Sequence, residues 1–321
     1  MKRILLLIVL CVFVSFTAYS ATAQRTILSH NGILTQYDAT HWQDAINDAV
    51  AGDTVYFTPG VFEYGLTIDK AITLIGAGVS EGDSFWKDKD INDVYAGCGT
   101  TDTSTRIIGD VTINIPGSIM LTATLMEGFA LDNVYVLSPV TNMVIKRCQA
   151  NTFKCGDWSS APPSVTNPVF ESCFFSQVQG GGLVNPDFHN CYIHQLAYAS
   201  ELEFLNCAII ENHECSGCTL INCIYPSIGY STCVNSVRRA GDEDVNSTYS
   251  NCWYEENAQC LTKEQLTDKG YIGIDGTVVG PLGGPAPFTL IPSQPYVSSS
   301  SITYLKSTKK LNVNVTVKQG K

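Results

Sequence analysis

Five segments of the chain share one short pattern: a large side chain, a variable residue, a small polar residue and a cysteine. They read FESC at 170–173, FHNC at 188–191, FLNC at 204–207, LINC at 220–223 and YSNC at 249–252. Aligned with earlier turn-like residues, the small polar positions recur every 16 to 19 residues wherever no insertion intervenes. Three short strands and three turns need about this many residues at about 3.3 Å per residue. The repeat therefore predicts a parallel β-helix, in which each coil stacks on the next.

Alternation along each coil predicts which side chains point inward. Phe204 and Cys207 should face the interior. Asn206 should form a bend, because asparagine tolerates the left-handed conformation and its amide can bond to the next asparagine of the stack. Cys191, Cys207 and Cys223 would then form one column, about 4.8 Å apart and pointing the same way, which is poor disulfide geometry. We expect buried free thiols that act as small hydrophobes.

Two short helices are expected outside the coils. The segment 40–50 has apolar residues at helical spacing, and Thr40 and Gln43 have the spacing of a capping box. The segment 261–270 has the same spacing, between Thr262 and Gln265. Between them, the β-rich runs TVYF, GLTI and AITLIGAG are separated by turns too short for crossover helices. These runs predict the first strands of the β-helix.

The C-terminal part of the chain changes in composition. Residues 273–295 are rich in glycine and proline, and we expect them to lie irregularly over the last coil. Two polar strands are predicted at 301–306 and 311–319, either shielding the end of the solenoid or beginning a small module. The predicted organisation is a β-helix domain over 24–295 and a hairpin or module over 296–321.

The first 23 residues have the features of a secretory signal peptide. Two basic residues precede an apolar run over 4–16, and Ala21 and Ala23 occupy the positions that a signal peptidase reads. The run is short for a membrane span, which needs about 20 residues. We predict cleavage before Gln24 and a secreted, periplasmic or cell-surface protein with no membrane span after signal cleavage.

The acidic composition bears on the partner. The formal net charge is −11 and becomes −13 without the two basic residues at the start. Because phosphates need a basic surface, the charge argues against nucleic acid. It is compatible with a polysaccharide or another cell-surface glycan. Export permits disulfides, but a chain of this length can bury a core without them.

Two stretches resemble known proteins. The run DAINDAVAGDTVYFTPGVFEYGLTIDKAITLIGAG, at 44–78, resembles the N-terminal cap and first coil of pectin-lyase-like right-handed β-helix proteins. The run LTKEQLTDKGYIGIDGTVVGPLGGPAPFT, at 261–289, resembles the closing segment of uncharacterised exported β-helix proteins from gut Bacteroidetes. The resemblance implies the fold. It does not imply one activity, since this fold hosts lyases, hydrolases, esterases, adhesins and binders.

Charged residues that could carry catalysis gather in two places. Lys146 and Arg147 lie in one coil, with no acid expected at the equivalent place in neighbouring coils, so they are interpreted as solvated surface charge. The second place is the insertion before 249–252, where a paired acid and base is one interpretation and a solvated loop the other. Its candidate catalytic residues are Asp242, Glu243, Asp244 and Arg238. The calcium cluster of pectate lyases has no clear match.

The cysteine-rich stretch HECSGC, at 213–218, has two of the features of a zinc site. A zinc site needs a second ligand pair at suitable spacing, which the sequence lacks. We expect no metal and no cofactor, and interpret these cysteines as a local disulfide or as core and turn thiols. The sequence leaves open the disulfide pairing of Cys98, Cys155, Cys215, Cys218, Cys233 and Cys260.

Aromatic residues are the candidates for sugar binding. They are Trp158 in an insertion and Phe174, Tyr192 and Trp253, which alternation points outward from the coils. A stripe of outward aromatic rings could stack against sugar rings. It could equally be covered by a loop or by the C-terminal segment.

Together, these features predict an all-β chain folded as a right-handed parallel β-helix, or solenoid, with a short N-terminal capping helix. The expected function is non-catalytic polysaccharide binding. The alternatives are a polysaccharide lyase or glycoside hydrolase acting through the 155–168 or 238–247 loops, and a structural or adhesion protein. A carboxylate pair in a groove would favour the enzyme. An open aromatic groove would favour binding, and a groove blocked by the C-terminal segment would favour a scaffold.

Overall fold

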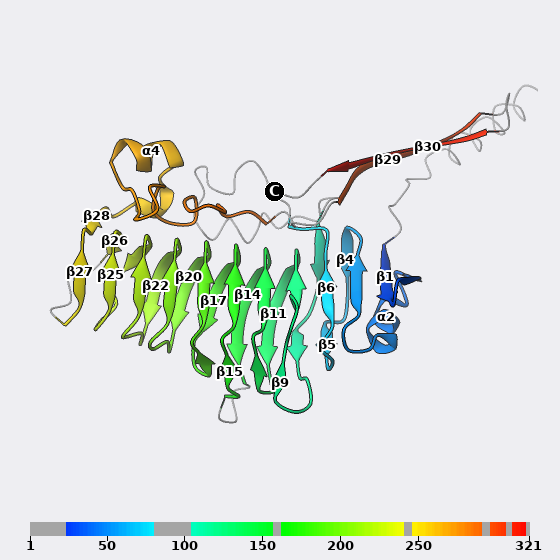
Figure 1. The fold of residues 1–321 in the computed structure, drawn as a ribbon, viewed down its shortest axis with the longest axis horizontal. Helices are drawn as coiled ribbons and strands as arrows, with labels where there is room; N and C mark the ends of the chain where they lie inside the picture. Colours follow the sequence, from blue (N-terminus) through cyan, green and yellow to red (C-terminus); the bar gives the residue numbers. More distant parts are fainter. Residues whose placement is uncertain are drawn as a thin grey trace, which may run out of the picture.

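The computed structural model describes residues 24–79, 104–156, 162–240, 246–290, 296–305 and 310–318. The described chain is mostly β-structure with long parallel sheets, as predicted (Figure 1). Outside the described residues lie Cys98, Trp158, Asp242, Glu243 and Asp244.

The first sheet has twelve strands. An antiparallel pair, β1 (Arg25–His30) and β2 (Ile33–Asp38), forms one end, and β1 also pairs antiparallel with the first strand of the parallel stack. The sequence patterns did not predict this pair. The parallel strands are β3 (Thr54–Phe57), β6 (Thr73–Ile75), β10 (Met126–Glu127), β13 (Val144–Lys146), β16 (Val169–Glu171), β19 (Asp187–His189), β21 (Glu203–Leu205), β23 (Thr219–Ile221), β25 (Thr232–Val234) and β27 (Thr248–Ser250).

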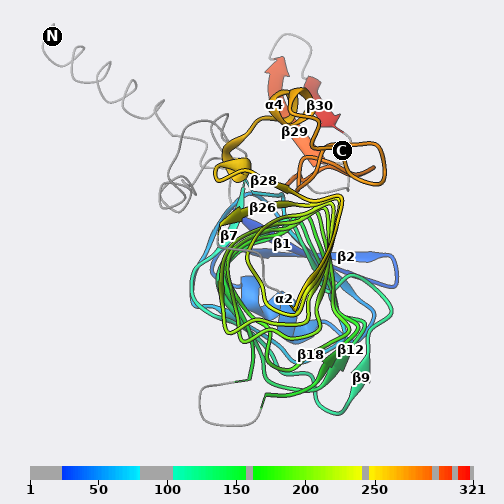
Figure 2. The ribbon, with the colours of Figure 1, turned by 90° about the vertical axis from the view of Figure 1, so that its left-hand side faces the viewer.

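The second sheet also has twelve strands, and the third has four. The second contains β4 (Gly60–Phe62), β5 (Leu66–Ile68), β7 (Thr105–Ile107), β8 (Val111–Ile113), β11 (Ala130–Val136), β14 (Gln149–Cys155), β17 (Phe174–Gln179), β20 (Tyr192–Ala197), β22 (Ala208–His213), β24 (Ile224–Pro226), β26 (Val237–Ala240) and β28 (Trp253–Tyr254). The third contains β9 (Ile119–Met120), β12 (Val140–Thr141), β15 (Val165–Thr166) and β18 (Leu183–Val184). The chain visits the sheets in turn and moves on by one strand at each circuit, which is compatible with a solenoid (Figure 2).

The bends between the first and second sheets have the predicted conformation. Seven of them are made by a residue other than glycine with positive φ, between 45° and 55°. These residues are Arg147, Ser172, Asn190, Asn206, Asn222, Asn235 and Asn251. The predicted amide ladder is present at one step, where Asn251 Nδ2 donates to Asn235 Oδ1 at 2.7 Å. The other asparagines are used differently, as described below.

Repeated side chains fill the interior. Phe170, Phe188 and Phe204 stack in consecutive coils, with ring centroids 4.6 and 4.9 Å apart. Next to them, Cys191 and Cys207 are fully buried free thiols, as predicted. Because burial disfavours the thiolate, it raises the pKa of both well above the usual value.

The buried thiols also join the coils through hydrogen bonds. Cys207 Sγ lies 3.2 Å from the carbonyl oxygen of Phe188, to which it can donate, and accepts the N–H of Cys191 at 3.4 Å. In a later coil Ser236 takes the same place, and its Oγ accepts the N–H of Cys223 at 2.8 Å. A hydroxyl can replace the thiol because this position needs a small group that both donates and accepts.

The first helix, α2 (Trp42–Asp48), buries the predicted face, including Trp42, which packs edge-on against Phe57 and Phe62. Its predicted capping box was wrong. The N-cap is His41, without a side-chain cap, and the Thr40 hydroxyl instead donates to Asp38 at 2.7 Å. The bonds from Thr40 and His41 hold the pKa of the Asp38 carboxyl well below its usual value.

Two short helices follow the last coil, the 3-10 helix η1 (Ala258–Cys260) and α4 (Lys263–Asp268). The predicted capping box of α4 is confirmed: Thr262 Oγ1 accepts from Gln265 N, and the Gln265 side chain accepts from Thr262 N. The Thr262 hydroxyl oxygen is therefore used as a cap, in contrast to Thr40, whose hydroxyl donates to the Asp38 carboxylate.

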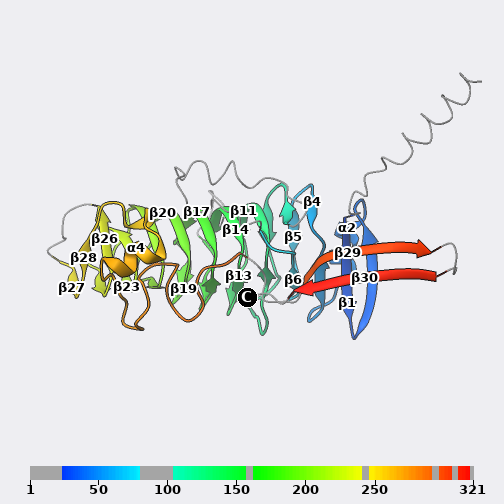
Figure 3. The same ribbon diagram turned by 90° about the horizontal axis from the view of Figure 1, so that it is seen from above.

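The expectation that the glycine-rich segment lies over the last coil was wrong. Residues 271–290, which we call the C-terminal strap, run back along the stack (Figures 1 and 3). Gly280 N donates to Asn222 O, and the strap reaches the early coils, where Val79 N donates to Leu290 O. The strands β29 (Tyr296–Leu305) and β30 (Lys310–Lys318) then form an antiparallel sheet of two strands.

Candidate functional site

One outward column of the second sheet collects the predicted sugar-binding aromatics. Parallel pairing places its members in register, one per coil. This outer column consists of Ala130, Gln149, Phe174, Tyr192, Ala208, Ile224, Val237 and Trp253. Phe174 and Tyr192 stack with ring planes 7° apart and centroids 5.2 Å apart. The structure therefore brings three of the four aromatic candidates to one column, and Trp158 lies outside the described residues.

The outer column is not open to a ligand, because the strap and the preceding helices cover it. Phe174 is 1% exposed and Tyr192 is 5% exposed. They belong to a second hydrophobic cluster, completed by Ala258, Leu266, Val278, Val279, Phe288 and Leu290. Trp253 is partly buried and lies against the ring of Tyr271, with centroids 5.6 Å apart. Of the two outcomes left open by the sequence, the structure has the covered stripe.

Asparagines of the bend column hold the strap. Asn190 Nδ2 donates to the carbonyl oxygens of Pro281 at 3.2 Å and Gly283 at 2.8 Å. Asn222 Oδ1 accepts the N–H of Ile274 at 2.8 Å. These amides therefore bind strap backbone instead of continuing the predicted ladder. A buried backbone group needs such a partner, since leaving it unpaired costs about 1–3 kcal/mol.

Close approach explains the glycines of the strap. A Cβ at Gly284 would lie 2.5 Å from Asn206 Nδ2, and one at Gly280 would lie 2.7 Å from the Ile224 side chain. Both glycines also have positive φ, 77° and 80°, which side chains disfavour. The strap can pack this tightly only because these positions have no side chain.

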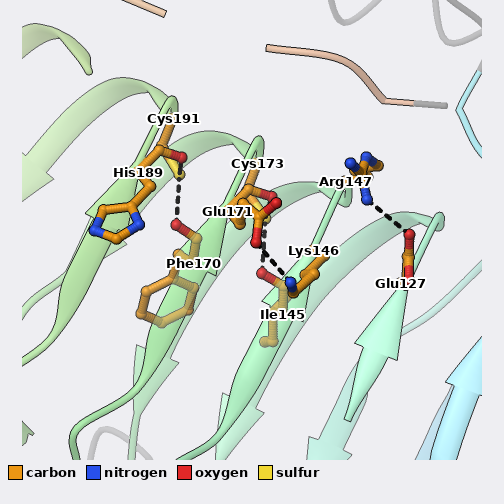
Figure 4. Close-up of polar contacts among 9 residues, drawn as sticks. All are labelled: Glu127, Ile145, Lys146, Arg147, Phe170, Glu171, Cys173, His189 and Cys191. Atoms are coloured by element: carbon orange, nitrogen blue, oxygen red, sulfur yellow. Dashed lines mark hydrogen bonds and ion pairs between the residues drawn. The ribbon is translucent and has the colours of Figure 1, made fainter. Parts of the chain in front are cut away.

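A second outward column carries charge, and it corrects the interpretation of Lys146 and Arg147. Glu127 and Glu171 do lie at the equivalent place in the neighbouring coils, in register with Lys146 (Figure 4). Lys146 Nζ is 2.6 Å from Glu171 Oε2. Arg147 Nη1 is 2.9 Å from Glu127 Oε1, with both side chains nearly buried. The expectation of isolated solvated charge was therefore wrong.

The signal for these acids was present in the sequence. Glu127, Lys146 and Glu171 each stand one residue before an aligned bend residue, so reading that column along the repeat would have found them. Their chemistry is that of ion pairs, because each carboxylate faces a cation from an adjacent coil. Paired acid and base carboxyls need instead one protonated and one free group facing a substrate.

Arg238, the candidate that the structure describes, lies in strand β26 near the end of the stack and not in the loop that follows it. Its guanidinium is 5.2 Å from the centroid of the Tyr254 ring, a cation–π contact. Its neighbour Arg239 donates to Gln259 Oε1 at 3.1 Å. The three acids of this loop lie outside the described residues, so their geometry toward Arg238 stays a prediction.

The other cysteines in the part of the chain that the structure describes are free. Cys155, Cys215, Cys218, Cys233 and Cys260 form no disulfide, which removes the local bridge within HECSGC as an interpretation. Burial raises the pKa of Cys218 to about 11 and that of Cys233 to about 12. Across the part of the chain that the structure describes, no three His, Cys, Asp or Glu side chains converge as a metal site would require.

No known protein family, curated protein or solved structure matches the chain. Within the described ranges, no helix has the length and apolar character needed to cross a bilayer.

Proposed function

We propose that the chain is an exported right-handed parallel β-helix, capped at its N-terminal end by α2, with a non-catalytic role in presentation or adhesion at the cell surface or in the periplasm. The covered outer column carries this proposal. The aromatic stripe that would stack on sugar is packed beneath the strap, with Phe174 and Tyr192 almost fully buried. The resemblance to pectin-lyase-like and exported β-helix proteins supports the handedness and the export.

The test compares stability with ligand retention in the same variants. We expect Tyr192→Ala and Phe174→Ala to lower the melting temperature, because each removes a buried ring. Retention on immobilised neutral and acidic polysaccharides should not change. Tyr192→Phe, which keeps the ring, is the matched control and should melt close to the original chain. Lost retention with an unchanged melting temperature would contradict the proposal.

Polysaccharide binding at a different face is the second candidate. Asn133, Thr152, Gln177 and Gln195 form an in-register, partly exposed polar column on the second sheet. Gln177 Nε2 donates to Gln195 Oε1 at 2.6 Å. Amides and hydroxyls one coil apart suit the hydroxyl groups of an extended glycan, although such ladders also stabilise stacked strands. Retention that is lost in Gln177→Ala and kept in Tyr192→Phe would favour this candidate.

The enzyme alternative is tested in the same panel. We expect no release of reducing or unsaturated sugar ends from any polysaccharide. Release that is abolished by the triple change Asp242→Asn, Glu243→Gln and Asp244→Asn would replace the scaffold proposal with a lyase or hydrolase.

A further inference from the structure

Strand β2 is an open edge of the first sheet. Among the described strands it pairs with β1 alone, and the strand order of the sheet ends there. Its first two side chains, Ile33 and Leu34, are 67% and 68% exposed. An edge strand with exposed apolar side chains is a template for pairing with another strand. This edge therefore has the properties of an interaction surface.

The C-terminal hairpin differs in charge from the rest of the chain. Residues 296–321 contain five lysines and no acid, whereas residues 24–295 contain 12 lysines and arginines against 30 acids, a formal charge of −18. The strands β29 and β30 form a sheet of two strands. A two-stranded hairpin is only marginally stable by itself in water, so a third strand or a covering surface would stabilise it.

Acids surround the open edge. Asp38 ends β2, and Asp44 and Asp48 lie on the exposed face of α2, which packs on β1 and β2. Three cations or histidines lie close to these acids. Lys70 is directed to the carbonyl oxygens of Ile46 and Asn47, at 3.0 and 2.7 Å. Arg25 pairs in register with Asp38 across β1 and β2, and His41 Nδ1 lies 2.8 Å from Asp38 Oδ1, so Asp44 and Asp48 carry most of the free negative charge. The edge thus combines a strand side that is open for pairing, an apolar surface and nearby acidic side chains.

We propose that β2 is the docking edge for the basic hairpin of a second copy of this chain, which adds to the sheet by strand addition. Main-chain hydrogen bonds would supply affinity, and attraction between the basic hairpin and the acids beside the edge, Asp44 and Asp48, would supply orientation and steering. Each copy offers one edge and one hairpin. Reciprocal docking therefore gives a closed two-fold dimer, the commonest symmetry of soluble oligomers.

Charge favours a second copy over an anionic polymer. A body of charge −18 repels a polyanion that approaches the hairpin, whereas the same negative charge attracts the hairpin of another copy. Docking of the hairpin on β2 of its own chain is a separate outcome of the test. This inference does not depend on the proposed function.

The experiment measures the mass of the chain from Gln24 onward by light scattering across concentration, at about 50 mM and about 500 mM salt. One variant ends before Tyr296, which removes the hairpin and keeps the edge. Another, Ile33→Lys with Leu34→Lys, keeps the hairpin and places positive charge on the edge. Ile274→Lys is the matched control, because Ile274 is equally exposed, at 70%, but lies in the strap.

We expect a dimer at low salt whose dissociation constant rises at least about tenfold at high salt, as screening weakens charge pairing. Each of the two variants should be monomeric by itself, and Ile274→Lys should still dimerise. Mixing the truncated chain with the edge variant should restore a one-to-one dimer, since one supplies the edge and the other the hairpin.

Three outcomes would overturn the proposal. The first is an original chain that is monomeric throughout, and the second is a dimer that survives loss of the hairpin. The third is failure of the two variants to combine. A monomer whose β2 amides exchange faster after truncation would assign the docking to the chain's own hairpin.

Discussion

The chain has two apolar cores that are assembled differently. The interior core is filled by the same positions of successive coils, such as Phe188 on Phe204 and Cys191 beside Cys207. The outer core lies on the outside of the second sheet and needs the strap to complete it. Partners in the interior are about one coil apart in sequence, whereas Asn190 and Gly283 are 93 residues apart.

The two cores therefore differ in how much of the chain must be ordered before their contacts can form. Closing a long loop costs more entropy than closing a short one, although the cost grows only slowly with length. Interior contacts can form as each coil is added to its neighbour. The outer core can form only after the coils exist. We therefore expect the interior to determine global stability and the strap to open locally.

The buried thiols of the interior should cause the strongest loss of stability, at alkaline pH. Burial raises the pKa of eight of them: Cys148, Cys155, Cys173, Cys191, Cys207, Cys215, Cys218 and Cys233. In the unfolded chain a thiol ionises near pH 8.5, so above that pH the unfolded state binds fewer protons. The unfolding free energy should fall as pH rises, by up to about 1.4 kcal/mol per thiol per pH unit.

Urea unfolding at about pH 7 and about pH 10 measures this loss. The double variant Cys191→Ser with Cys207→Ser is the control. Its unfolding free energy should depend less steeply on pH, by the contribution of the two thiols that it lacks. An unfolding free energy that is the same at both pH values would show that the buried thiols do not stay protonated in the fold.

The next effect separates the two cores directly. Phe188→Ala, in the interior, should lower the global unfolding free energy by about 3–5 kcal/mol, because the cavity lies between stacked rings. Tyr192→Ala, in the outer column, should mainly speed amide exchange in residues 271–290. Hydrogen exchange combined with denaturant melting measures both. Equal loss of protection throughout the chain in Tyr192→Ala would mean that the two cores unfold as one.

A smaller effect tests whether the interior thiols act through hydrogen bonds as well as through packing. Cys207→Ala leaves the N–H of Cys191 without its sulfur partner and should cost about 1–3 kcal/mol. Cys207→Ser keeps a group that both donates and accepts, as Ser236 does at the equivalent position of a later coil. It should therefore lower the unfolding free energy by less than Cys207→Ala. Denaturant melting ranks the three proteins. If the alanine variant is at least as stable as the serine variant, the Cys207 thiol stabilises the fold only through packing.

The smallest effect tests the close contact of the strap. Gly284→Ala and Gly276→Ala both place a side chain at positive φ, 77° and 76°, which costs about 1–2 kcal/mol each. Only Gly284 is also crowded, since a Cβ at Gly276 has no heavy atom within 4 Å. Exchange protection of the strap should therefore fall further in Gly284→Ala. Equal protection in the two variants would mean that the strap is not held at Asn206.

Local patterns predicted much of the structure and failed where a neighbour competed. The capping box at Thr262 is confirmed, whereas the same spacing at Thr40 failed because the Asp38 carboxylate accepts its hydroxyl. The left-handed asparagines are confirmed, but the partners of Asn190 and Asn222 were missed. Those partners lie in a glycine-rich segment without a periodic pattern, so nothing in the sequence aligned them with the bends.

The repeat, the parallel stacking, the bend residues and the buried free thiols follow from the order of the amino acids, because each depends on alternation and on contacts one coil away. The role of the outward residues depends instead on which distant segment of the folded chain covers them. Phe174 and Tyr192 have the same outward position whether they meet sugar, water or protein, and the strap made them core. Lys146 became part of an ion-pair row only because parallel register placed Glu127 and Glu171 beside it.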